Sequence, residues 1–229
     1  MNKKIIVAID LDSLKKTISL VKKLKNEVFG FKIGHEFFYN FGIEGYKKIY
    51  KLHPKIFLDL KLHDIPNTVE KGLKAILNLK PNFTTIHISG GDEMQKITKF
   101  IRNKKTKILG VTILTSLNEK QTLKYYNERN LKGLVKKYAS YAKNNKLDGL
   151  VCSPLEIETV RKEVGRKMIL VVPGIRPENN NLKKNDDQKR VLTPKEAINL
   201  GADYLVIGRP IIESKNPLDT IKKINQSIQ

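Results

Sequence analysis

The chain has 229 residues, of which 40% are hydrophobic and 29% charged, and its formal net charge is +21. This composition is typical of a globular protein with an apolar core, and the strand-sized apolar runs exclude a transmembrane helix or a signal-peptide core. The 44 basic residues include only seven arginines and are spread from Lys3 to Lys223, unlike the clustered, arginine-rich surfaces of nucleic-acid readers. We therefore expect a cytoplasmic protein with no membrane partner and no specific nucleic acid.

Eight apolar segments rich in β-branched residues recur along the chain at a regular spacing. In chain order they are IIVAID (5–10), GFKIG (30–34), KIFLDLKL (55–62), FTTIHI (83–88), KILGVTIL (107–114), DGLVCS (148–153), MILVVPG (168–174) and DYLVIG (203–208). Strands that alternate with helices predict a parallel sheet, and eight is the number that closes a (β/α)8 TIM barrel. A doubly wound open sheet is the alternative, but it usually has fewer strands, and no GxGxxG motif follows the first segment.

The segments between the predicted strands have helical periodicity and recognisable ends. Apolar residues spaced three or four apart follow the first strand, at Leu14, Ile18, Val21 and Leu24. Asn67 and Thr68 are suitable residues for the start of the third helix. Near the C-terminus, Thr193 can cap a helix over 194–200 that Gly201 ends.

We expect residues 1–229 to form one domain, because no linker, internal boundary or low-complexity tract interrupts the pattern. The polar segment 178–190, ENNNLKKNDDQKR, is the one long irregular stretch, and a loop of that length in a barrel is often an active-site lid. Cys152 is the only cysteine, which rules out an intramolecular disulfide or a cysteine-based zinc site, and we expect it in the core.

Three charges stand at the end of the third predicted strand, in the segment FLDLKLHDIPNT (57–68). Asp59 and Lys61 are two residues apart and share one face, whereas the leucines alternate with them and would pack outward against helices. The two charges then point into the barrel near the carboxyl ends of the strands, where barrel active sites lie. Lys32 arrives from the neighbouring strand and can pair with Asp59, because an unpaired buried charge costs several kcal/mol. A structural ion-pair network is the alternative interpretation.

The last two strands are followed by residues suited to binding phosphate. Arg176 stands in PGIRP, and Gly208 and Arg209 stand in IGRP. Loops after the seventh and eighth strands of a barrel frequently bind phosphate, glycine lets the backbone approach an anion, and arginine offers two parallel donors. Gln188 in the polar segment can close over the same group. A plain strand-to-helix turn is the alternative interpretation of IGRP.

No metal site is predicted, because the sequence has no HExxH motif, no cysteine cluster and no P-loop. His87, at the end of the fourth predicted strand, is expected to line the barrel interior near the site. His63 is expected at the rim as a hydrogen-bonded structural residue.

Taken together, these segments resemble the bacterial branch of the orotidine 5′-phosphate decarboxylase family, over the whole chain. FLDLKLHDIPNT is similar to the family's signature. The other matching segments follow in the family's order and are VAID (7–10), FKIGHEFF (31–38), LTS (114–116), PGIRP (173–177), DDQKR (186–190) and IGRPI (207–211). A DxKxxD motif alone is shared with related barrels, whereas the combination is specific.

The resemblance implies a homodimeric enzyme without metal or cofactor that converts orotidine 5′-phosphate to UMP and CO2, the last step of de novo pyrimidine synthesis. Lys32, Asp59, Lys61 and Asp64 match the family's charged catalytic array, with Asp64 reaching into the site of the other subunit. The other implied substrate contacts are Asp10, Lys32 and, across the interface, Thr68 at the ribose, Thr115 and Ser116 at the pyrimidine, and Arg176, Gln188, Gly208 and Arg209 at the phosphate, with Asp59 near the departing carboxylate. Two departures from the family are a longer segment between Arg176 and Gln188 and His35 in place of an apolar residue.

The implied mechanism needs an ammonium group beside C6, where loss of CO2 leaves a carbanion. Lys61 would stabilise this charge and then protonate it, with Asp59 and Asp64 favouring its charged form. Binding of the remote phosphate would drive lid closure and exclude water.

Two rival functions are weighed against this one. Hexulose-phosphate synthase and 3-keto-gulonate-phosphate decarboxylase are related barrels that use Mg²⁺ to stabilise an enediolate. They would need an acid on the second strand, where Lys32 would repel a cation. A basic nucleic-acid-binding protein with a vestigial site is the other rival, and the intact charged array argues against it.

Overall fold

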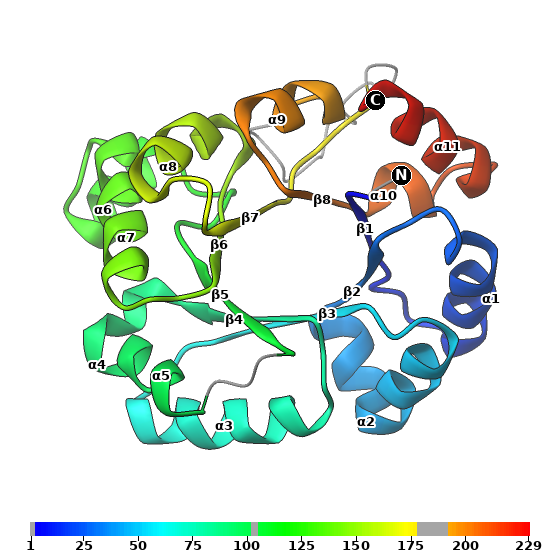
Figure 1. Cartoon of the computed structure of the whole chain (residues 1–229), viewed down its shortest axis with the longest axis horizontal. Helices are drawn as coiled ribbons and strands as arrows, with labels where there is room; N and C mark the ends of the chain where they lie inside the picture. The colour runs from blue at the N-terminus through cyan, green and yellow to red at the C-terminus, as the bar shows by residue number, and fades with distance from the viewer. Residues whose placement is uncertain (1–2, 102–104, 178–191) are drawn as a thin grey trace.

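Eight parallel strands close into a barrel, and helices surround it (Figure 1). Figure 1 shows the computed structural model of the chain, which describes residues 3–101, 105–177 and 192–229. The strands are β1 (Ile5–Ala8), β2 (Gly30–Ile33), β3 (Ile56–Leu62), β4 (Phe83–His87), β5 (Lys107–Val111), β6 (Gly149–Val151), β7 (Ile169–Val172) and β8 (Tyr204–Ile207). Each strand pairs with the next, and β8 pairs with β1, so the predicted TIM barrel is confirmed and the open sheet is excluded.

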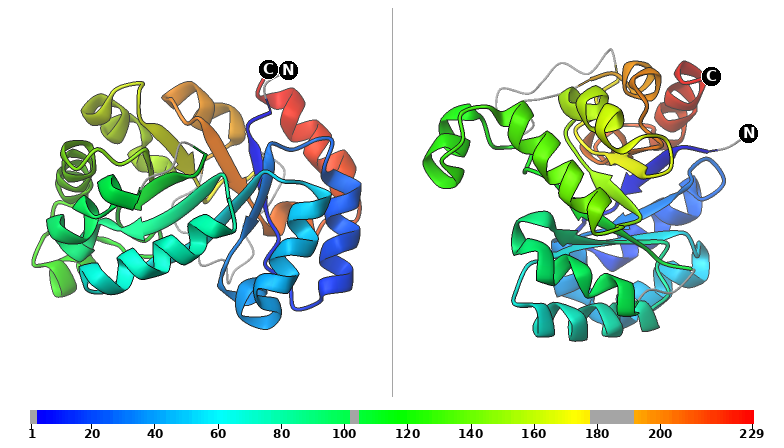
Figure 2. Two further views of the ribbon diagram at one scale, coloured as in Figure 1. Left: turned by 60° about the horizontal axis from the view of Figure 1, so that its bottom comes forward. Right: turned by 60° about the vertical axis from the view of Figure 1, so that its left-hand side comes forward.

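The helices of the described residues follow the strands and form the outer layer. They are α1 (Leu14–Leu24), α2 (His35–Leu52), α3 (Pro66–Asn78), the 3-10 turn η1 (Ile88–Gly90), α4 (Gly91–Lys96), α5 (Thr98–Ile101), α6 (Glu119–Tyr126), α7 (Leu131–Asn144), the 3-10 turn η2 (Pro154–Glu156), α8 (Ile157–Val164), α9 (Pro194–Leu200), α10 (Arg209–Ile212) and α11 (Pro217–Ser227). The last helix packs beside the first and completes the ring (Figure 2). None of these helices combines the length and apolarity needed to cross a membrane.

One of the two predicted helix starts is confirmed, and the other lies one residue later than the observed start. The Thr193 hydroxyl caps α9 by accepting from the Glu196 N–H, and Gly201 ends the helix with a left-handed φ of 111°. In contrast, α3 begins at Pro66, with Ile65 at the cap position and no side-chain cap, so Thr68 already lies within the helix. The reason is that proline has a fixed helical φ and no N–H to satisfy, which suits the first position of a helix.

Two layers of apolar side chains form the core. One lies between the strands and the helices and includes Cys152, whose predicted burial is confirmed. The other fills the inside of the barrel, and its buried members are Ile6, Phe57, Phe83, Leu109, Val111, Val151, Val171 and Val206. Residues two apart on a strand share a face. The inward-facing positions of each strand therefore continue from this inner layer to the carboxyl end of the strand.

Aromatic rings close the amino-terminal end of the barrel, and we call this group the aromatic floor. Phe29, just before β2, lies 4.3 Å from Tyr204 and 5.7 Å from Phe83 between ring centroids. Tyr204 and Phe83 are 5.3 Å apart, and Phe57 meets Phe83 edge-on at 6.0 Å. Because the interior is packed with apolar groups at this end, polar chemistry is confined to the carboxyl ends of the strands.

Candidate active site

Four charged side chains from three neighbouring strands form a chain of alternating sign, which we call the charged array. Asp10 follows β1, Lys32 lies in β2, and Asp59 and Lys61 lie in β3. The Lys32 ammonium is 2.6 Å from the Asp10 carboxylate and 3.7 Å from that of Asp59. Asp59 in turn accepts a hydrogen bond of 2.8 Å from Lys61. The structure therefore brings together the predicted residues of strands one to three.

The inner pair of the charged array is the more deeply buried. The side chains of Asp59 and Lys32 are 8% and 14% exposed, compared with 28% for Lys61. Burial lowers the pKa of Lys32, but the charges of Asp59 and Asp10 outweigh it and raise the pKa above its ordinary value. Burial likewise raises the pKa of Asp59, and Lys32 and Lys61 lower it below the ordinary value. Both groups are therefore charged at neutral pH, and Lys61 is the ammonium most accessible from outside.

Gly34 makes room for the contact between Asp10 and Lys32. Its N–H donates to the second carboxylate oxygen of Asp10 at 2.6 Å. A Cβ at position 34 would stand 2.6 Å from the Asp10 carboxylate and 2.7 Å from the Lys32 ammonium, closer than any side chain tolerates. A larger residue at position 34 would therefore push the ends of the Asp10 and Lys32 side chains out of their present positions.

A bulge in β3 places Lys61. In the pairing of β3 with β4, Leu58 is opposite Thr84 and Leu62 is opposite Ile86, so β3 has two extra residues in this interval. Lys61 lies in the bulge with a left-handed φ of 48°, which costs a non-glycine residue about 1–2 kcal/mol. The predicted outward packing of the leucines is confirmed, because Leu58 belongs to the layer between strands and helices and Leu62 packs against it. The predicted meeting of Asp59 and Lys61 on one face is also confirmed by their contact at 2.8 Å, whereas the bulge at Lys61 was not predicted.

Two side chains of β4 complete the inner wall beside the charged array. Thr85 is fully buried, accepts from the Lys61 N–H at 2.9 Å and donates to Asp59 at 2.9 Å. The sequence interpretation missed Thr85, although its spacing of two from His87 was a usable signal. Burial, together with His63 and Lys61, lowers the pKa of His87 to about 4, so its imidazole is neutral at neutral pH. The predicted place of His87 near the site is consistent with these neighbours.

The predicted phosphate residues lie after β7 and β8. Arg176 is half-buried, and its N–H donates to the Leu192 carbonyl at 3.0 Å, which joins the two sides of the segment after β7. Gly208 caps α10 and approaches β1, where an added Cβ would meet that of Ala8 at 3.3 Å. Arg209 is exposed on the first turn of α10. Gln188 and the predicted lid 178–190 lie outside the described residues, so both stay predictions.

The other predicted residues lie at the same end of the barrel, nearer its surface. Asp64 is exposed, and within the described part of the chain its carboxylate accepts only the Ile65 N–H. Thr68 is exposed on the first turn of α3. Thr115 is half-buried and Ser116 exposed in the turn after β5. No contact with the charged array is found for Asp64 within one chain, and its assignment to a partner's site stays a prediction.

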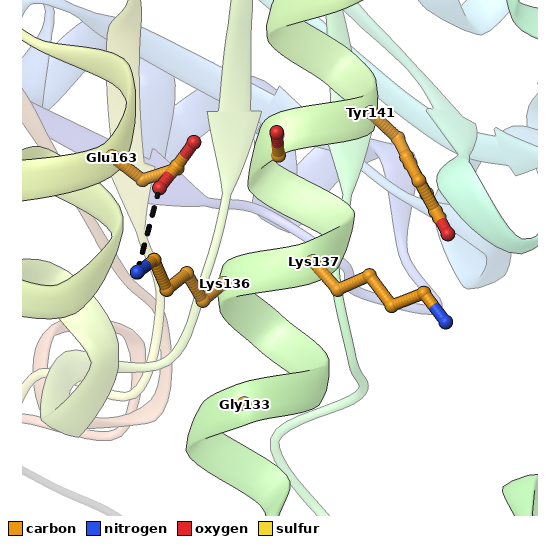
Figure 3. Close-up of a pocket in the computed structure, with 6 residues that line it drawn as sticks. Gly133, Lys136, Lys137, Tyr141 and Glu163 are labelled. Carbon is orange, nitrogen blue, oxygen red and sulfur yellow. Dashed lines mark ion pairs between the residues drawn. The ribbon is translucent and has the colours of Figure 1, made fainter.

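A surface pocket on the helical layer is unrelated to the charged array. Its lining residues, drawn in Figure 3, are Gly133, Lys136, Lys137, Ser140, Tyr141 and Glu163. The one ion pair drawn there joins Lys136 to Glu163 at 4.0 Å (Figure 3). All six residues belong to α7 and α8, outside the barrel wall, so this pocket has no access to the carboxyl ends of the strands. Nowhere in the described ranges do three or more His, Cys, Asp or Glu side chains gather as a metal site would require.

Comparison with known proteins gives this geometry a family. The model of the orotidine 5′-phosphate decarboxylase / HUMPS family matches residues 3–224. The chain belongs to this family. A family member from Wolbachia pipientis subsp. Culex pipiens, named orotidine 5′-phosphate decarboxylase, is 44% identical over 225 residues, which cover 98% of both chains. The resemblance inferred from the sequence motifs is confirmed.

Two further members of the orotidine 5′-phosphate decarboxylase / HUMPS family extend the likeness. An orotidine 5′-phosphate decarboxylase from Dictyoglomus thermophilum is 40% identical over 234 residues, covering 98% of this chain and 95% of that one. The crystal structure of the orotidine 5′-phosphate decarboxylase from Lactobacillus acidophilus matches with a TM-score of 0.84 and 35% identity over the full length of both chains. Sequence and fold thus point to the same family.

Proposed function

We propose that this chain decarboxylates orotidine 5′-phosphate to UMP and CO2, the last step of pyrimidine biosynthesis. Relatives with 38–44% identity over nearly the whole chain are named for this reaction. The observation that carries the proposal is the charged array. In it, the Lys61 ammonium is fixed by Asp59 at 2.8 Å, and Lys61 is more exposed than Lys32. A decarboxylation without an electron sink needs such a fixed ammonium beside the carbon that loses CO2.

The substrate, Lys61 and solvent account for every bond and proton of the reaction assigned to Lys61. The bond between C6 and the carboxylate breaks, CO2 leaves, and the electron pair stays on C6. The Lys61 ammonium stabilises this charge and then gives its proton to C6, which forms the C6–H bond of UMP. Lys61 then regains a proton from solvent, and the site is ready for another substrate.

The other members of the charged array hold Lys61 and the ribose in place. Asp59 orients the Lys61 ammonium and would lie beside the departing carboxylate. Lys32 and Asp10, which contact each other at 2.6 Å, are assigned to the ribose hydroxyls. The array contains two positive and two negative groups, so it presents oriented dipoles rather than a net charge to the pyrimidine. Thr115 and Ser116, in the turn after β5, are assigned to the pyrimidine edge.

The phosphate is assigned to Arg176, Gly208 and Arg209 after β7 and β8, with Gln188 as a further predicted contact. Arg209→Ala is expected to lower kcat/KM for orotidine 5′-phosphate by about 10²-fold or more, because a charge-assisted contact is lost. The loss for orotidine, which has no phosphate, should be several-fold at most. Steady-state assays of both substrates test this. Equal losses would remove Arg209 from the phosphate site.

A homodimer is proposed as the working form, with Asp64 and Thr68 contributed across the interface. Its support is the exposure of Asp64 and Thr68 next to large apolar side chains at the same end of the barrel. Ile65 is 66% exposed and Tyr39, on the first turns of α2, is 74% exposed. Large exposed apolar groups beside a site are typical of an interaction surface.

The assay that tests the proposed function is decarboxylation by the purified protein in excess EDTA. We expect the ultraviolet absorbance of orotidine 5′-phosphate to fall as UMP forms, at the same rate with and without chelator. The rival is a Mg²⁺-dependent barrel of the same family, which would need an acid where Lys32 contacts Asp10 and Asp59. Loss of activity in EDTA and its return with Mg²⁺ would favour the rival.

A further inference from the structure

Thr85 joins the two catalytic residues of β3 through a single hydroxyl group. Its oxygen accepts from the Lys61 N–H at 2.9 Å, and its hydrogen is donated to the Asp59 carboxylate at 2.9 Å. The residue is fully buried, so neither contact is shared with bulk solvent. One hydroxyl thus contacts the backbone of Lys61 and the side chain of Asp59, two residues apart in the bulge.

The bulge at Lys61 needs a hydrogen-bond partner that holds its backbone in place. Lys61 has a left-handed φ of 48°, and its N–H has left the regular ladder of β3 and β4. A strained backbone persists only where its surroundings define it strongly, and a buried N–H without a partner is costly. The Thr85 hydroxyl supplies that partner. At the same time it occupies the Asp59 oxygen that Lys61 does not use, because Lys61 contacts the other one.

We infer that Thr85 is a positioning residue for decarboxylation, which sets the Lys61 ammonium by fixing both the β3 bulge and the Asp59 carboxylate. This inference rests on the proposed function of Lys61. Thr85 does not touch the reacting carbon in this scheme. Its effect is expected on the chemical step, because the ribose and phosphate contacts come from other strands.

The neighbouring Thr84 provides a matched control. It lies one residue earlier on β4, is also fully buried, and its hydroxyl has no hydrogen-bond partner in the described structure. Thr85→Val and Thr84→Val therefore make the same isosteric change, one on the array and one on the outer face of the strand. Thr85→Ser keeps the hydroxyl and loses only the methyl group.

Turnover gives the first test. Thr85→Val is expected to lower kcat by about 10- to 100-fold, the scale of one lost hydrogen bond to a charged group, with KM changed less than about threefold. Thr85→Ser should restore most of kcat, and Thr84→Val should match the wild type. If Thr85→Val does not fold, Thr85→Ser and Thr85→Ala make the same comparison. A kcat for Thr85→Val equal to that of Thr84→Val, or equal losses of kcat and of UMP affinity, would overturn the inference.

A second readout separates this inference from the proposed function. Burial raises the pKa of Asp59, and Lys32, Lys61 and the Thr85 hydrogen bond lower it. Carbon NMR titration of Asp59 without substrate should show a higher pKa in Thr85→Val than in Thr85→Ser. An unchanged value would contradict the inference even in an active enzyme. A wild-type protein that binds UMP but does not decarboxylate would contradict the proposed function and leave the Asp59 titration valid as a test of positioning.

Discussion

Lys61 combines an ammonium group with a backbone conformation that few non-glycine residues adopt. Its φ of 48° turns the chain so that the side chain lies against Asp59 at 2.8 Å, two residues earlier in the same strand. The same bulge directs the Lys61 N–H to Thr85 rather than to the sheet. The residue therefore carries local strain at the point where chemistry is expected, as functional sites often do.

Lys61→Ala is expected to lower kcat by about 10²- to 10⁴-fold, because the proton donor is lost, while the protein stays folded and UMP still binds. Turnover and UMP titration measure the two effects. Lys74→Ala is the control, since Lys74 is exposed on α3 and, among the residues that the structure describes, pairs only with Glu70. Turnover of the Lys61 variant within a few-fold of the wild type would refute the assignment.

His87 is expected to make the fold sensitive to acid. Its folded pKa is about 4, because of burial and the nearby His63 and Lys61, whereas an unfolded histidine titrates near about 6.5. Between these values the unfolded chain binds more protons, so stability is complete above about pH 6.5 and falls as pH falls toward about 4. His87→Gln should reduce the loss of unfolding free energy between pH 7 and pH 5 by roughly 1 kcal/mol after screening by solvent.

Urea unfolding at the two pH values measures this difference. His35→Gln is the control, because His35 is exposed on α2 and its ring contacts only Tyr39 edge-on among the aromatic groups described. If the wild type and His87→Gln lose the same stability on acidification, His87 is not the acid-sensitive group.

At the scale of elements, the exit of β2 is shaped by a glycine. Gly34 lets the end of the strand pass against the Asp10–Lys32 pair. Its carbonyl accepts from the Phe38 N–H in the first turn of α2, and its own N–H donates to Asp10. The strand, the helix start and the ion pair are therefore one structural unit. A change in the backbone there acts directly on two residues of the charged array.

Gly34→Ala is expected to lower kcat/KM by about 10-fold or more, because an added methyl group displaces Asp10 or Lys32 from their contact at 2.6 Å. Gly72→Ala is the control. It adds a methyl group within α3, where the nearest atom is a flexible Leu62 carbon at 3.3 Å. Unchanged kinetics in Gly34→Ala would contradict the expectation that activity depends on the contact between Asp10 and Lys32.

The sequence predicted the elements better than it predicted their irregularities. The spacing and the number of apolar segments were enough to predict an eight-stranded barrel. The positions of Asp59 and Lys32 inside it followed from the predicted strands. The bulge could not be foreseen, because the left-handed residue is Lys61 rather than a glycine or asparagine, and its conformation is imposed by tertiary contacts with β4. The spacing of Thr85 from His87 indicated its face of β4, but its partners could not be predicted, since they are set by that bulge.

At the scale of the whole molecule, the net charge of the chain differs from that of the charged array. The formal net charge is +21, yet the charged array contains equal numbers of positive and negative groups. The excess positive charge therefore comes from residues outside the array, and its field attracts an anionic nucleotide toward the protein. In the proposed function, binding of the phosphate and stabilisation of the carbanion are therefore separate electrostatic tasks.

The proposed dimer predicts complementation between two inactive variants. Lys61→Ala and Asp64→Asn each inactivate both sites of their own homodimer. In a mixed dimer one site has both changes and the other has neither, so denaturing and refolding the two together should restore up to about a quarter of wild-type activity. Activity of the refolded mixture is compared with each variant refolded alone. No gain, with mixed dimers demonstrated by mass spectrometry, would place Asp64 in its own subunit's site.

The aromatic floor determines the end of the barrel at which substrate can enter and products can leave. Phe29, Phe83 and Tyr204 meet within 6 Å of one another across the amino-terminal end of the barrel. The barrel is therefore closed at its amino-terminal end. In the proposed reaction, the nucleotide enters and both products leave at the carboxyl-terminal end.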